Sequence, residues 1–153
     1  CSSDLNALEL SVPSNWRQAD DGGSLLFATE GGFHQTQNGG TAYTHGVQVG
    51  VARMQTSNLQ RETDALLQGF ARSNPQLRRS GSYRQESLDG HRSLTATLSN
   101  VSEVSGQREY VSVTTIQLRD GTMAYLIGVS PQSDAQAYET AFRNVRRSVR
   151  LND

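Results

Sequence analysis

The histidines, the cysteine and the carboxylates are the side chains of this sequence that could hold a metal or carry catalysis. His34, His45 and His91 are far apart, no His-Glu-x-x-His sequence occurs, and Cys1 is the only cysteine. Zinc sites draw three or four such ligands from short, regular spacings. Carboxylates that are adjacent, such as Asp20 and Asp21, fall in a turn sequence where solvated charge is the simplest interpretation. The sequence therefore predicts no metal site and no cofactor within this chain.

The usual nucleophiles are also absent from the contexts that activate them. All 14 basic residues are arginine, which excludes a Schiff-base lysine and a phosphate-binding loop that ends in lysine. A serine nucleophile on a strand-to-helix turn needs a Gly-x-Ser-x-Gly sequence, and the chain contains none. We therefore expect that the chain alone is not an enzyme.

Four arginines near the C-terminus form a charged pattern with a defined geometry in a predicted helix. Its residues are spaced at i, i+3, i+4 and i+7, so they share a helix face that lies roughly 110° from the apolar stripe and flanks the core. The simplest interpretation is a solvated face whose cations favour a helix C-terminus. The alternative is a patch for an anion or an acidic partner, because arginine binds carboxylates and phosphates bidentately. The residues are Arg143, Arg146, Arg147 and Arg150.

A glycine-rich segment, residues 30–41, is the second candidate region. It is expected to be a mobile surface loop, and such loops often carry function. It lacks the Gly-x-Gly-x-x-Gly spacing and the strand-to-helix context of a phosphate cradle. The candidate residues of this loop are Glu30, Gly31, Gly32, His34, Asn38 and Gly39.

Two apolar runs, residues 108–118 and 122–131, are predicted to be the central strands of the fold, which would position the side chains of any site. They flank Asp120-Gly121, the pair that favours a two-residue hairpin turn, which would place Leu118 opposite Met123 and Ile116 opposite Tyr125. Both faces of these strands are apolar rather than alternating. We therefore expect them to lie in the middle of a sheet, with a helical layer on each side.

Two helices are available for those layers. Ser57 and Asn58 offer an N-terminal cap to an amphipathic helix that should end before Asn74-Pro75. The second helix follows Pro131, with Ser133 or Asp134 as its cap. Its apolar stripe consists of Ala135, Tyr138, Phe142, Val145 and Val149.

Five further strands complete the predicted fold. Their order is three strands, a helix, four strands and a helix, which indicates an α+β domain with a mostly antiparallel sheet of about seven strands sandwiched between helices. Residues 1–6 are expected to form a linker and residues 7–153 a single domain. The added strands are expected at residues 7–12, 24–29, 45–53, 83–88 and 91–99, the last two joined at Asp89-Gly90.

Two stretches of this sequence resemble the Mog1/PsbP-like superfamily. The opening Leu8-Glu-Leu-Ser-Val-Pro-Ser-Asn-Trp16 is similar to its first strand, and Tyr125-Leu-Ile-Gly-Val-Ser-Pro131, continued through Tyr138, Phe142 and Ser148, to its closing strand and helix. The resemblance implies an α/β/α sandwich. Members are mainly non-enzymatic: photosystem accessory subunits, a Ran-binding factor, and secreted or lipid-anchored bacterial proteins. Similar segments also resemble C-terminal modules of bacterial zinc metallopeptidases.

Composition narrows the function further. A net charge of −1 argues against a general nucleic-acid binder, which needs excess positive charge. Cys1 is either the start of a lipid-anchored protein or the edge of a fragment. We expect a non-enzymatic interaction or accessory module of an extracytoplasmic bacterial protein, periplasmic or in the cell envelope. Its partner would be another protein or another domain of the same polypeptide, and any membrane contact would come through a lipid on Cys1. The alternatives are an accessory domain of a zinc metallopeptidase and a small-ligand carrier.

Overall fold

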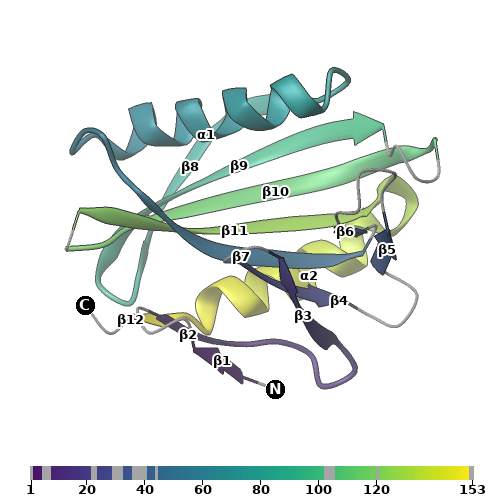
Figure 1. Cartoon of the computed structure of the whole chain (residues 1–153), viewed down its shortest axis with the longest axis horizontal. Coiled ribbons are helices and arrows are strands. Elements are labelled where there is room, and N and C mark those ends of the chain that lie inside the picture. Colours follow the sequence, from purple (N-terminus) through teal and green to yellow (C-terminus); the bar gives the residue numbers. More distant parts are fainter. Residues whose placement is uncertain are drawn as a thin grey trace.

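The computed structural model describes residues 2–4, 8–21, 24–28, 33–35, 41–43, 45–101, 106–119 and 121–151. These residues form three sheets and two α-helices, which Figure 1 shows together. In chain order the elements are β1 (Ser2–Asp4), β2 (Leu8–Ser11), β3 (Arg17–Asp21), β4 (Ser24–Ala28), β5 (Phe33–Gln35), β6 (Thr41–Tyr43), β7 (Gly46–Arg53), α1 (Leu59–Ser73), β8 (Arg78–Leu88), β9 (His91–Val101), β10 (Arg108–Gln117), β11 (Thr122–Pro131), a 3-10 turn (Gln132–Asp134), α2 (Ala135–Arg147) and β12 (Arg150–Leu151).

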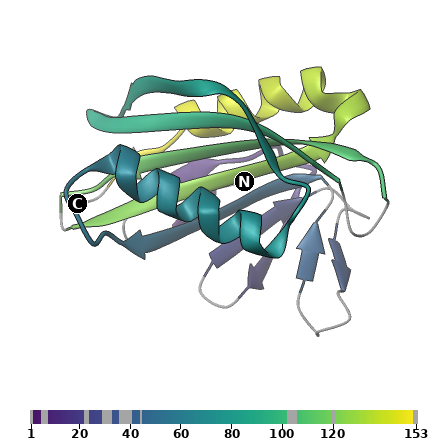
Figure 2. The ribbon, with the colours of Figure 1, turned by 90° about the horizontal axis from the view of Figure 1, so that it is seen from above.

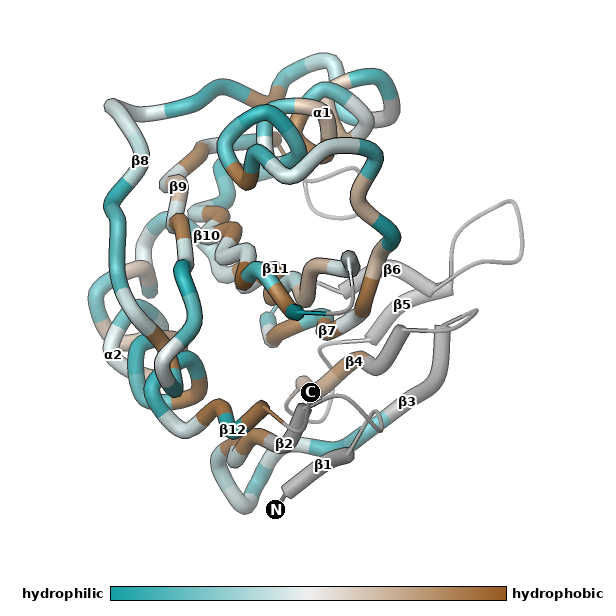
Figure 3. Tube along the Cα trace, turned by 90° about the vertical axis from the view of Figure 1, so that its left-hand side faces the viewer, coloured by the Kyte–Doolittle hydropathy of each residue, from teal (hydrophilic) through white to brown (hydrophobic). Residues whose placement is uncertain are grey.

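The largest sheet has seven antiparallel strands in the order β3-β4-β7-β11-β10-β9-β8. The helix α1 lies across one face of this sheet, as Figure 2 shows, and α2 packs on the other face, so that the sheet lies between them in Figure 3. The predicted α+β class, the seven-stranded antiparallel sheet and the helix on each face are confirmed, and β10 and β11 lie in the middle as expected.

The central hairpin differs from its prediction by one residue. Gln117 faces Met123, and the Leu118 backbone N–H donates to the Thr122 carbonyl at 3.0 Å, so three residues, 119–121, join the strands. Gly121 has φ 85°, the left-handed conformation that closes three-residue loops. The predicted pairs are therefore wrong, because a shift of one residue exchanges the two faces of a strand. Asp120 lies outside the described residues.

Apolar side chains from β10 and β11 fill both faces of the sheet. Ile116, Ala124 and Leu126 are buried under α2, whereas Val113 and Ile127 are buried under α1. Both strands are thus covered on two sides, which explains why their sequences do not alternate between apolar and polar residues.

The hairpin between β8 and β9 has the predicted two-residue turn. Leu88 faces His91, and Asp89 and Gly90 have φ values of 50° and 78°, as a tight hairpin turn requires. The strand β8 begins at Arg78, five residues earlier than predicted. The prediction missed these residues because they are polar and show no apolar alternation. It forms one edge of the seven-stranded sheet.

Both helices begin and end near their predicted positions. The Asn58 Oδ1 accepts from the Arg61 backbone N–H at 3.1 Å and caps α1, which ends at Ser73, before Pro75. The helix α2 follows a 3-10 turn, and its N-cap residue Asp134 makes no side-chain capping hydrogen bond. On α2, Phe142 and Val145 of the predicted stripe are buried.

The N-terminal third contains more strands than predicted. The strand β2 pairs with β1 and β12 in a separate sheet, and β3, which forms a hairpin with β4, was not predicted. Residues 2–4, assigned to a linker from the sequence, form β1. The predicted loop, residues 30–41, is wrong at residues 33–35, which form β5, and at Thr41, where β6 begins and pairs with β5. Three-residue strands are too short to produce a periodic apolar pattern.

Candidate functional site

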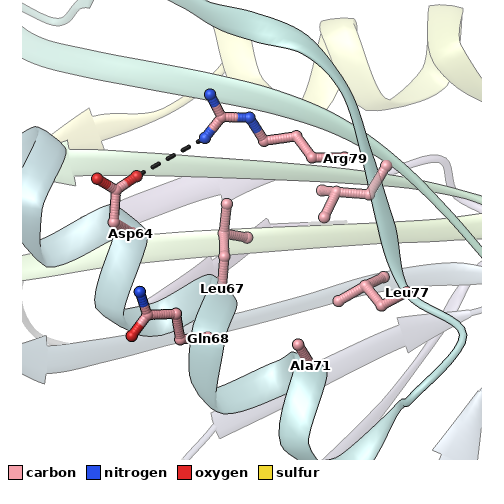
Figure 4. Close-up of a pocket in the computed structure, with 7 residues that line it drawn as sticks. Asp64, Leu67, Gln68, Ala71, Leu77 and Arg79 are labelled. Carbon is pink, nitrogen blue, oxygen red and sulfur yellow. Dashed lines mark ion pairs between the residues drawn. The ribbon is translucent and has the colours of Figure 1, made fainter.

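A groove runs between α1 and the edge strand β8. It encloses about 250 Å³ and is shown in Figure 4. We call it the α1–β8 groove. Its lining residues are Asp64, Leu67, Gln68 and Ala71 from α1, Leu77 just before β8, Arg79 from β8 and Leu98 from β9.

The floor of the α1–β8 groove is apolar. Leu67 and Leu98 are buried, Leu77 is half-buried, and Ala71 is exposed at the helix side of the opening. The amphipathic pattern of α1 explains this arrangement, because Leu67 and Ala71 are four residues apart on the face turned toward the sheet. A leucine-sized side chain on this floor could therefore exchange water for apolar contacts.

At one end of the groove, three polar side chains interact with one another. The Asp64 Oδ1 accepts a short hydrogen bond from the Tyr83 hydroxyl and lies 3.7 Å from the Arg79 Nη1. The Arg79 guanidinium carbon lies 4.3 Å from the centre of the Tyr83 ring, which is a cation–π contact. Burial, and then the hydrogen bond to Asp64, raise the pKa of Tyr83 above its ordinary value. The phenol therefore keeps its proton further into the alkaline range than an ordinary tyrosine does.

A distortion of β8 brings these groups together. The β8–β9 register shifts between Ser80 and Arg84, and Gly81 has φ 78° within this irregularity. Such bulges are common on edge strands, where they re-aim side chains. Here Tyr83 points toward α1, where its hydroxyl reaches Asp64.

Arginine side chains also engage the backbone of this edge. The Arg79 Nε donates to the Gly81 carbonyl at 3.0 Å. The Arg78 Nη1 donates to the Pro75 and Leu77 carbonyls, both at 2.9 Å. Of these three carbonyls, only that of Gly81 belongs to β8, and the other two lie in the segment that leads into the strand.

The four arginines predicted to share a helix face are separated in the structure. Arg146 is only 6% exposed, and its Nη2 lies 3.1 Å from the Glu86 Oε1. The prediction that all four flank the core is wrong for Arg146, because it lies only about 40° from Phe142 around the helix. Desolvation lowers the pKa of Arg146, although the charge of Glu86 opposes that effect.

The other three arginines are closer to solvent. Arg143 forms an ion pair with Glu139 at 3.2 Å, and Arg147 is exposed. Arg150 lies on β12 instead of the helix, because α2 ends at Arg147, and its Nη1 donates to the Val149 carbonyl at 2.9 Å. Arg143 and Arg147 thus remain neighbours on α2, and an anion or partner patch there stays a prediction.

Of the predicted loop residues, His34 lies on β5 and faces Ala42. The remaining candidates, Glu30, Gly31, Gly32, Asn38 and Gly39, lie outside the described residues. Within the described part of the chain, no three His, Cys, Asp or Glu side chains gather as metal ligands do.

Sequence reasoning did not find the α1–β8 groove. Asp64 and Tyr83 are 19 positions apart on different elements, and no motif links them. The only available signal was Gly81, which marks an irregular strand just before Tyr83.

Comparison with protein-family models and with curated protein sequences finds no match. Solved structures do match. Cyanobacterial PsbP (CyanoP) from Synechocystis sp. PCC 6803 has a TM-score of 0.66 at 14% identity, covering 99% of this chain and 91% of CyanoP. The Saccharomyces cerevisiae Ran-binding protein Mog1p has a TM-score of 0.64 at 13% identity, covering 100% of this chain and 95% of Mog1p.

A third similar structure is LpqN of Mycobacterium tuberculosis, described as involved in cell envelope biogenesis. Its TM-score is 0.62 at 13% identity, covering 95% of this chain and 83% of LpqN. At such identities the likeness establishes the fold alone. The chain therefore has a Mog1/PsbP-like fold, as the sequence resemblance implied. No described helix is long and apolar enough to cross a membrane.

Proposed function

We propose that this chain is a non-enzymatic binding module of an extracytoplasmic bacterial protein, and that it binds another polypeptide in the α1–β8 groove. The observation that carries this proposal is the pairing of an apolar floor with an exposed charged end. Leu67 and Leu98 supply burial for an anchor side chain, while Arg79 and Asp64 supply polar contacts that fix orientation. Binding sites on proteins commonly combine these two features.

The size of the groove favours a polypeptide over a small-molecule ligand. Pockets that enclose drug-sized ligands usually measure about 300–1,000 Å³, and the α1–β8 groove measures about 250 Å³. That volume suits one or two side chains of a larger partner, whose remaining surface would contact the exposed parts of α1 and β8.

A second groove, of about 460 Å³, lies between the end of β2 and α2, but its lining includes no charged residue. It is bounded by Val12, Pro13, Ala137, Ala141 and neighbouring residues. It offers an apolar surface but no ionic group to set orientation. We therefore assign partner binding to the α1–β8 groove.

The chemistry of the charged end fits recognition better than catalysis. A general base or nucleophile needs a group that can release its proton near neutral pH. The raised pKa keeps Tyr83 protonated, so no phenolate is available as a base or nucleophile near neutral pH, and Asp64 already accepts a hydrogen bond from the phenol. These groups are arranged to keep one another in place.

The extracytoplasmic location is supported by LpqN, a protein of similar fold that is described as involved in cell envelope biogenesis. The partner in this proposal is another envelope protein or another domain of the same polypeptide.

The polypeptide site is tested by filling the groove. Ala71 is exposed at the opening, so Ala71→Trp should block it without disturbing the core. Ala65→Trp is the matched control, because Ala65 is also exposed and lies about 120° away around α1. A random peptide library displayed on phage would be selected against the whole chain, and the enriched peptides tested on both variants.

The expected result is that the enriched peptides bind the wild type and Ala65→Trp but lose at least about tenfold in affinity for Ala71→Trp. Failure to enrich any peptide, or equal binding to both variants, would overturn the proposal. Circular dichroism of both variants checks that they are folded.

A further inference from the structure

We infer that the flank of α2 that faces β8 binds a phosphate group, which is held between Arg84 of β8 and Arg147 of α2. The site lies on the face of the large sheet that α2 covers, opposite the face that carries the α1–β8 groove. The arginines that meet there are called the α2–β8 arginine cluster and are Arg84, Arg143, Arg146 and Arg147.

The register of β8 turns Arg84 toward α2. Arg84 and Glu86 are two residues apart in the regular part of the strand, so their side chains point to the same face of the sheet. The Glu86 Oε1 lies 3.1 Å from the Arg146 Nη2, which identifies that face as the one under α2. Figure 3 shows β8 beside α2. Arg84 is therefore a neighbour of the C-terminal half of α2.

The other arginines of the cluster lie on one flank of α2. Around the helix, Arg146 lies about 40° from the buried Phe142. Arg143 and Arg147 follow on the same side, at about 100° and about 140°. Because Arg146 is paired with Glu86 of β8, this flank is the one that faces β8.

Positive charge exceeds negative charge in the α2–β8 arginine cluster. Glu86 pairs with Arg146, and Glu139 pairs with Arg143 at 3.2 Å. Arg84 and Arg147 are both exposed, and in the described part of the chain neither side chain makes an ion pair or a hydrogen bond. Two guanidinium charges are therefore left without a counter-charge.

The surroundings of Arg146 show the effect of this excess. Arg146 is 6% exposed, and among the described residues its Nε has no hydrogen-bond partner. Burial lowers the pKa of Arg146, and the charges of the other three arginines of the cluster lower it further, against the single opposing charge of Glu86. An anion bound near Arg84 and Arg147 would reduce this repulsion.

The sheet surface beside Arg84 is polar on this face. By the β8–β9 register, Ser80 of β8 and Thr97 of β9 lie opposite each other and on the same face as Arg84. Ser80 is exposed and Thr97 is half-buried. An anion at this place would therefore meet hydroxyl groups and water, and it would not have to displace apolar contacts.

A phosphate monoester matches the unbalanced charge better than a carboxylate does. It carries between about 1.5 and 2 negative charges at neutral pH and offers three strong acceptor oxygens, whereas a carboxylate carries one charge on two oxygens. A guanidinium binds phosphate bidentately. One phosphate group therefore has enough acceptors and enough charge for Arg84 and Arg147 together.

NMR titration of the isotope-labelled whole chain with inorganic phosphate tests the site, at about pH 7.5, where phosphate is mostly the dianion. Sodium chloride keeps the ionic strength constant, and acetate is titrated as the carboxylate comparison. The test variant combines Arg84→Gln with Arg147→Gln. The matched control combines Arg53→Gln with Arg72→Gln, which removes the same charge from two other exposed arginines. Circular dichroism checks that both variants are folded.

We expect the wild type and the control variant to bind phosphate equally and the test variant to bind it at least about tenfold more weakly. The chemical-shift changes should centre on residues 84–86 and 143–147, and acetate should bind more weakly than phosphate. Equal phosphate affinity in the two variants, or shift changes spread over the whole surface, would overturn the inference. Acetate binding as tight as phosphate binding would do the same.

Vesicles distinguish a lipid headgroup from a soluble phosphate compound as the source of the phosphate. They are made of phosphatidylcholine alone or of phosphatidylcholine with phosphatidic acid, whose headgroup is a phosphate monoester. Cosedimentation that requires phosphatidic acid and is lost in the test variant would support the site and assign it to a lipid. Phosphate binding without cosedimentation would support the site and assign it to a soluble compound. Cosedimentation that persists in the test variant, or the absence of both kinds of binding, would count against the site.

Discussion

The two helices cover opposite faces of one sheet, and the packing of aromatic side chains beneath them differs. Under α2, the Trp16 ring stacks on Tyr138 at 6.4 Å between centres, and the Tyr110 ring stacks on Phe142 at 6.4 Å. Phe142 is in contact with Gly128, where even a Cβ atom would lie 2.7 Å from its ring. Under α1, Leu66, Phe70 and Leu77 are only half-buried, and the α1–β8 groove remains open.

The ion pairs of the two faces differ in the same way. The side chains of Arg146 and Glu86 are 7% and 20% exposed, whereas those of Arg79 and Asp64 are 40% and 45% exposed. A buried pair must stay intact, because breaking it leaves a desolvated charge. An exposed pair can exchange partners at little cost. The ion pair on the α2 side should therefore matter more for stability than the pair on the α1 side.

The largest expected effect comes from truncating the aromatic side chain of each helix. Phe142→Ala should lower the free energy of unfolding by about 3–5 kcal/mol, because it leaves a cavity in a closed core. Phe70→Ala should cost less than half as much, since Phe70 is half-buried beside an open groove. Urea unfolding measures both, and equal losses would contradict the contrast between the faces.

The second prediction neutralises one carboxylate on each face. Glu86→Gln should destabilise the fold by about 3 kcal/mol, because Arg146 would keep its charge without an ionic partner in a buried position. Asp64→Asn should cost under about 1 kcal/mol at its exposed position. Thermal unfolding at neutral pH separates the two. A small loss in Glu86→Gln would show that Arg146 reaches water more easily than its burial indicates.

The third prediction concerns pH. The pKa of Tyr83 is raised, so the folded chain keeps that proton at pH values where the unfolded chain has lost it, above about pH 10. The stability that Tyr83 contributes is therefore complete below that pH and declines as the pH rises. Tyr83→Phe should cost about 1 kcal/mol at neutral pH and should make the alkaline decline shallower. Urea unfolding at a series of alkaline pH values tests this, and an unchanged slope would be the contrary result.

The smallest effect is expected on the outer face of α2. Replacing Arg143 and Arg147 together with glutamine should change the free energy of unfolding by under about 1 kcal/mol, because both side chains reach solvent. If these arginines form an anion or partner site, association should weaken while stability is preserved. A large loss of stability would place them among the packed residues, beside Arg146.

The sequence was sufficient to predict the layers of the fold. Asn58 and Pro75 mark the limits of α1, and the doubly apolar runs of β10 and β11 identify the central strands. The register of the central hairpin was not predictable from those runs. Because both faces are apolar, a one-residue shift leaves the pattern unchanged, and Asp120-Gly121 suits either loop length.

The candidate site was beyond the reach of sequence patterns. Arg146 follows Arg143 in a pattern typical of an exposed charged face, and no sequence pattern indicates that Arg146 is buried and forms an ion pair with Glu86. The Asp64, Arg79 and Tyr83 cluster depends on a register shift in β8, which changes which way each side chain points. Interactions of this kind are determined by tertiary packing, so they cannot be predicted from local sequence propensity.

The small sheet formed by β1, β2 and β12 gives the molecule a defined orientation. The strand β2 pairs with the first described strand on one side and the last on the other, so both ends of the described chain leave from one region, as Figure 1 shows. The helix α1 lies on the far side of the large sheet from that region. A polypeptide joined to either end would therefore be attached on the side opposite α1. The α1–β8 groove would face away from that attachment and stay exposed to solvent.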